Sequence, residues 1–61
     1  MWIVMVYGVK HSAWKDKEEA NHKALALRHH GYKGIKVVKD ANEDVENGFY
    51  YDVAGLKPQQ V

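Results

Sequence analysis

Four histidines are the side chains best suited to metal chemistry in this chain of 61 residues: His11, His22, His29 and His30. Two ligands on one helix face need a spacing of three or four residues, as in the zinc motif H-E-x-x-H. His22 and His29 lie seven residues apart, whereas His29 and His30 are adjacent and would point about 100° apart on a helix. Cysteine is absent too, so we expect solvent-facing histidines, no metal site and no cofactor.

Oxygen-bearing side chains at alternate positions, Asp40, Asn42 and Asp44, match the opening of a calcium-binding loop. The match ends at Val45, where the motif requires glycine, and at Tyr51, where it requires glutamate. We therefore interpret residues 40–46 as a solvated acidic loop between two strands.

The sequence offers no nucleophile with a general base placed to activate it. Ser12 is the only serine and has His11 beside it, but neighbours along the chain do not have the geometry of a catalytic pair. The glycines lack the spacing of a phosphate-binding loop, and a chain this short has little room for a substrate pocket. We expect a protein that is not an enzyme and has no small-molecule substrate.

The length of the chain indicates one small domain. We expect residues 1–55 to form the domain and residues 56–61 a loose C-terminal tail. The net charge of +1 combines +5 in residues 1–39 with −4 in residues 40–61. The apolar run at the start is too short to span a bilayer, and cysteine is absent, so a cytoplasmic location without membrane contact is the expectation.

The elements that would position these residues follow from periodicity and from residues typical of helix ends. Residues 2–9 are apolar except for one glycine and predict a strand. Ser12 is the expected N-cap of a helix over residues 13–30, which Gly31 ends. Residues 35–39 and 49–54 read as a strand hairpin with a turn at Asn47 and Gly48. The predicted fold is α+β, in the order β-α-β-β, with one helix packed on one face of a three-stranded mixed sheet.

This order is similar to the first part of SPOR-type peptidoglycan-binding domains. The resemblance covers residues 4–55 and rests on a Val-rich strand, a helix ending in Leu27 and Gly31-Tyr32, Val37, and the run Tyr50-Tyr51-Asp52-Val53. The pattern includes neither the second helix nor the fourth strand of that family. The resemblance therefore implies the β-α-β-β topology alone, and we transfer no function or site residue from it; either the first or the third strand could lie at the centre of the sheet.

The first strand is apolar on both faces, although one helix covers only one face of a sheet. We place Trp2, Val4 and Val6 toward the helix, together with residues of the later strands, Ile35, Val37, Phe49, Tyr51 and Val53. The open face would then carry the binding residues Ile3, Met5, Tyr7, Val38, Tyr50 and Asp52. A shift of one residue would exchange the two sets, and the tail could cover the second face through Leu56.

An uncovered apolar face favours a protein-interaction module, with a homodimer or another protein as partner. The alternative is nucleic-acid binding. That surface would use Tyr7 and Tyr50 for stacking and the basic side chains of Lys15, Lys23, Arg28, Lys33 and Lys36.

Overall fold

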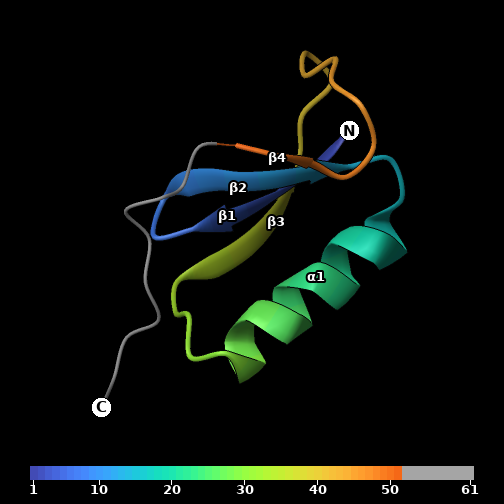
Figure 1. Ribbon diagram of the computed structural model, residues 1–61. Coiled ribbons are helices and arrows are strands. Elements are labelled where there is room, and N and C mark those ends of the chain that lie inside the picture. The colour runs from blue at the N-terminus through green and yellow to red at the C-terminus, as the bar shows by residue number, and fades with distance from the viewer. Residues whose placement is uncertain (52–61) are drawn as a thin grey trace.

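A computed structural model describes residues 1–51 of the chain. Its elements are β1 (Trp2–Val6), β2 (Val9–Trp14), α1 (Lys17–His29), β3 (Ile35–Lys39) and β4 (Phe49–Tyr50). The strands form one sheet in the order β3-β1-β2-β4, in which every neighbouring pair is antiparallel. Helix α1 lies against one face of this sheet (Figure 1). The protein is thus a small α+β fold, but residues 1–51 contain four antiparallel strands rather than the three mixed strands predicted.

The predicted first strand over residues 2–9 is in fact a hairpin turn with parts of two strands. Tyr7 and Gly8 both have positive φ, at 54° and 77°, and join Val6 to its partner Val9 as a two-residue loop. Positive φ at both positions is what a type I′ turn requires, and its twist suits the flanking strands. The apolar run therefore turns back on itself instead of continuing along one strand.

The predicted helix start was also wrong. Residues 9–14 pair with β1, and Ser12 is a fully buried strand residue opposite Val4. The helix begins at Lys17 with Asp16 as N-cap, and no side chain caps it. Sheet pairing outweighs the local preference for a helix at residues 13–16, because a strand here completes hydrogen bonds with β1.

The helix ends as predicted, at a left-handed glycine. Gly31 has a φ of 94°, its N–H donates to the carbonyl of Arg28, and the N–H of Tyr32 donates to the carbonyl of Leu27. These two bonds form a Schellman motif, in which the last helical carbonyls find partners. Tyr32 packs against the core beside Leu27, which fixes the direction of the chain toward β3.

The core lies between α1 and the β3-β1 half of the sheet. Its buried members are Val4, Val6, Ala20, Ala24, Leu27 and Ile35, with Trp2 and Val37 packed against them. Trp2, Val4 and Val6 therefore face the helix, as the pattern predicted. Alanines at two helix positions let α1 approach the strands closely, so a narrow apolar stripe suffices.

The predicted hairpin between residues 35–39 and 49–54 does not form within the described residues. β4 pairs with β2, and β3 pairs with β1 at the other edge of the sheet. This pairing corrects two predicted orientations, because Phe49 and Tyr51 lie on the face away from α1. Val53 and the remainder of that predicted strand lie outside the described residues.

A β-bulge in β2 changes which side chains face the helix. Val4 pairs with Ser12, whereas Met5 pairs with Lys10, so His11 is an extra residue in β2. At a bulge the alternation of faces is interrupted. His11 and Ser12 consequently both lie on the side of α1, where His11 contacts Tyr50.

Candidate functional site

Three of the predicted binding residues lie on the sheet face away from α1. Ile3 pairs with Val38, and Met5 follows on the same face of β1. Ile3, however, is fully buried, Met5 is half-buried, and Val38 at the sheet edge is 39% exposed. The face is therefore not open at its centre, although its margin is.

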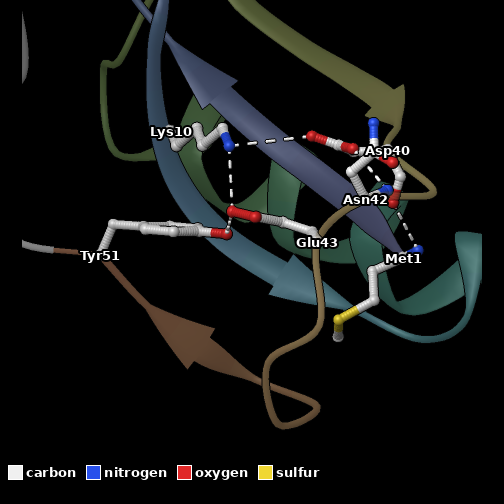
Figure 2. A network of polar contacts seen from close by, with 6 residues as sticks. All are labelled: Met1, Lys10, Asp40, Asn42, Glu43 and Tyr51. Carbon is white, nitrogen blue, oxygen red and sulfur yellow. Dashed lines mark hydrogen bonds and ion pairs between the residues drawn. The ribbon is translucent and has the colours of Figure 1, made fainter.

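One connection of the chain is bound on the side of this second face. The connection over residues 40–48 runs from β3 at one edge of the sheet to β4 at the other, on the side away from α1 (Figure 1). From it, Glu43 accepts hydrogen bonds from the Lys10 ammonium at 2.9 Å and from the Tyr51 hydroxyl at 2.6 Å (Figure 2). Lys10 also lies 3.7 Å from Asp40. The acidic connection is thus bound to β2 and to Tyr51 on this side of the sheet.

Hydrogen bonds and burial in this network shift the pKa values of its members. The hydrogen bond from Tyr51, followed by that from Lys10, lowers the pKa of Glu43. Lys10 responds in the opposite sense, because its bond to Glu43 raises its pKa. Burial, followed by the bond to Glu43, raises the pKa of Tyr51 to about 12. Each shift favours the ionisation state in which the three groups bind one another at neutral pH.

The predicted tyrosines Tyr7 and Tyr50 lie away from this face, which corrects their assignment to it. Tyr7 occupies the β1–β2 turn, packs against the core, and accepts a 3.3 Å hydrogen bond from the N–H of Lys33. Tyr50 lies on the helix side, where it contacts His11 and Trp14 edge-on. The last predicted binding residue, Asp52, lies outside the described residues.

A groove lies on the helix side of the described surface. It has a volume of about 530 Å³ and is lined by one residue of β2 and five of α1: Trp14, Glu18, Glu19, His22, Lys23 and Ala26. Helix α1 packs mainly on β1 and β3, so the strip of sheet formed by β2 and β4 remains beside it. The groove follows from this off-centre placement of the helix.

Aromatic and cationic side chains border the groove. The ammonium of Lys23 lies 5.1 Å from the centre of the Tyr50 ring, and the Trp14 and Tyr50 rings meet edge-on at 6.0 Å. Tyr50 is 52% exposed and stands at the edge of the sheet. Tryptophan and tyrosine are enriched at protein interfaces, because they bury a large area with few rotatable bonds.

Trp14 is held in place by a buried hydrogen-bond chain. Its indole N–H donates to the Ser12 hydroxyl at 2.8 Å, and that hydroxyl lies 3.1 Å from Nδ1 of His11. This suits a neutral imidazole whose Nδ1 accepts the Ser12 proton. Burial, followed by the charge of Lys23, lowers the pKa of His11 and keeps it neutral. Ser12 is fully buried, so the chain orients the indole and cannot present a nucleophile.

Sequence reasoning missed this groove because it assigned residues 13–16 to a helix. The signal that could have revealed it is Gly8, because a glycine inside a run predicted as one strand can adopt the positive φ that a hairpin turn requires. A hairpin there would have made residues 9–14 a strand and placed Trp14 beside the helix.

The predicted nucleic-acid residues do not form one surface. Lys36 pairs with Met5 on the face away from α1, whereas Lys23 lies over Tyr50 on the helix side. Lys15 borders a second groove with the acidic residues Asp44 and Glu46. The other two, Arg28 and Lys33, are exposed near the C-terminal end of α1.

Known proteins offer no comparison from which to assign this groove a role. No family model, curated protein or solved structure matches the chain. In residues 1–51, no three histidine or carboxylate side chains come together as a metal site. Nor does α1, the helix of that part of the chain, have the length and apolar character needed to cross a membrane.

Proposed function

We propose that this protein is a small non-enzymatic interaction module that binds an extended segment of a partner protein along β4, beside the groove of α1. The observation that carries the proposal is the position of Tyr50. It is half-exposed on an edge strand and directly contacts Trp14 and Lys23 of the groove. Other domains bind extended peptides between an edge strand and a helix, with alternate side chains entering the adjacent groove.

The backbone of β4 supports this mode. The backbone N–H of Tyr51 donates to the carbonyl of His11 at 3.0 Å, so this N–H points toward β2. Successive residues of a strand turn their N–H and C=O groups to opposite sides, so those of Tyr50 point outward. Outward groups on an edge strand are ready partners for another strand.

Self-association through the sheet face is the less favoured form of this proposal, because Ile3 at the centre of that face is fully buried. The edge remains, and a second copy would compete for it with a foreign segment. We favour a foreign segment, because the groove lies beside the edge and could accept the side chains of such a segment. Pairing of two sheets edge to edge would leave the groove empty. Sedimentation at rising protein concentration separates the two, since dimers through β4 would form without any added peptide.

The test is a titration of the protein with extended octapeptides of alternating valine and threonine, followed by amide and indole NMR signals. We expect saturable shifts at Tyr50 and at the indole N–H of Trp14. Two variants isolate the edge: Tyr50→Pro removes the outward N–H, whereas Tyr50→Val removes the ring and keeps that N–H. A proline is tolerated on an edge strand because its missing N–H would face solvent.

Peptide binding should therefore be lost in Tyr50→Pro and partly retained in Tyr50→Val. The same titration on the folded variants, checked by circular dichroism, provides the comparison. Equal binding by both variants would remove β4 from the proposal, and an absence of shifts in the wild type would remove the proposal itself.

Nucleic-acid binding is the second candidate, and one observation favours it. The ammonium groups of Lys17 and Lys39, from α1 and β3, lie 5.3 Å and 5.9 Å from the ring centre of Trp2. Neither ammonium has a carboxylate within 4.0 Å among residues 1–51. An aromatic ring between free cations suits a single strand with stacked bases. Titration with single-stranded DNA at low salt should then shift Trp2, and no shift there would exclude it.

A further inference from the structure

We propose that the groove selects a cationic side chain, preferably arginine, from the bound segment; this inference rests on the proposed function. The groove has one aromatic wall, Trp14, and an acidic rim, Glu18 and Glu19. Its volume of about 530 Å³ lies in the range of small ligand sites, so it has room for a long side chain.

The indole wall is fixed before any partner arrives. Ser12 holds its N–H at 2.8 Å, and Tyr50 meets the ring edge-on. Gly48 packs against the ring as well, since a Cβ at this glycine would lie 3.5 Å from Cζ3 of Trp14. A rigid ring loses little conformational entropy on binding, which favours stacking of a planar group against it.

The rim carries negative charge that the described chain does not neutralise. Glu18 and Glu19 are exposed in the first turn of α1, and the ion pairs within residues 1–51 are those of Lys10 with Asp40 and Glu43. Lys23 also lines the groove, and its ammonium lies over the Tyr50 ring at 5.1 Å from the ring centre. Two carboxylates and one ammonium leave the groove lining with a net negative charge, which favours a cation from a partner.

Arginine fits this combination better than lysine. Its guanidinium is planar, stacks on aromatic rings, and presents several N–H donors in the plane that carboxylates can accept. In the proposed complex, the guanidinium lies over Trp14 and donates to Glu18 or Glu19. Lysine offers a point charge without the planar stacking surface, so it should bind more weakly.

The experiment compares three octapeptides that differ at one central position, arginine, lysine or citrulline, in titrations of the whole chain followed by the Trp14 indole signal. Citrulline keeps the shape of arginine and lacks its charge. The citrulline peptide should bind about tenfold more weakly than the arginine peptide, as expected for loss of a hydrogen bond between charged groups.

The double variant Glu18→Gln, Glu19→Gln should bind the arginine and citrulline peptides equally. Glu46→Gln, an exposed residue of the acidic connection, is the matched control and should keep the wild-type preference. If all three peptides bind the wild type equally, charge selection is wrong while the interaction module stands. If none binds, the proposed function itself fails.

Discussion

The hydroxyl of Tyr51 donates a 2.6 Å hydrogen bond to the carboxylate of Glu43, and this bond ties the residue after β4 to the connection over residues 40–48 (Figure 2). Glu43 lies eight residues before Tyr51, on the far side of a turn. Its carboxylate also binds Lys10 of β2, so three segments meet at one group. These polar bonds hold the connection to β2 and to Tyr51 on the side of the sheet away from α1.

Substitution of Ile3 tests whether the sheet face away from α1 is packed within the protein. Ile3→Ala should lower the free energy of unfolding by about 2–5 kcal/mol, as for a large side chain removed from a packed core. Val38→Ala, at the exposed margin of the same face, should cost much less. Chemical denaturation of both variants provides the measurement. Equal, small effects would mean that the face is open to solvent.

Tyr51 should ionise only at high pH. Its pKa of about 12 lies above its usual 10.0, so the folded state holds the phenolic proton more tightly than the unfolded state. This contribution to stability is therefore complete below pH 10 and is lost as the pH rises toward 12. Phenolate absorbance should show one late-ionising group that disappears in Tyr51→Phe. Its persistence in that variant would contradict the assignment.

Ser12 should matter as the centre of a buried hydrogen-bond chain. Ser12→Ala leaves the Trp14 N–H and Nδ1 of His11 without a partner, at a cost of about 1–3 kcal/mol in unfolding free energy. A double-mutant cycle with Trp14→Phe measures the coupling directly. A coupling energy of zero would show that the two side chains do not share the bond.

His11 should make stability depend on pH near neutrality. Its pKa lies below 6.5, so the folded state favours the neutral ring. The contribution of the neutral His11 ring to stability is complete above pH 6.5. It is lost as the pH falls through the lower pKa that His11 has in the folded state. Protonation would place a charge beside Lys23 and take away the acceptor of the Ser12 hydroxyl. Denaturation across this range should show the loss in wild type and His29→Gln, and a smaller loss in His11→Gln.

Gly8 should be needed for its backbone conformation alone. Its φ is +77°, and a Cβ placed there meets no atom within 4 Å. Gly8→Ala should therefore cost about 1–2 kcal/mol, the strain of a left-handed residue with a side chain. Gly8→Asn should cost less, since asparagine tolerates this conformation. Thermal unfolding of the two variants compares them, and equal losses would point to a contact instead of strain.

The sequence by itself determined the elements whose signals are local. Gly31 predicted the end of α1, because a left-handed cap depends on neighbouring residues. The helix-facing side of β1 followed from the alternation of side chains along a strand. The order of the strands did not follow, and the interpretation of Ser12 as an N-cap assigned Ala13 and Trp14 of β2 to the helix.

Only the tertiary structure decided which strands pair and where the acidic connection is bound. Residues 12–14 suit a helix start locally, and they become part of a strand because β1 pairs with them. The bulge at His11 and the bond from Lys10 to Glu43, 33 residues apart, depend on that pairing. The groove beside Trp14 also depends on this pairing, because β2 places Trp14 next to α1. Such contacts join segments that are distant in the sequence, so no pattern within one segment predicts them.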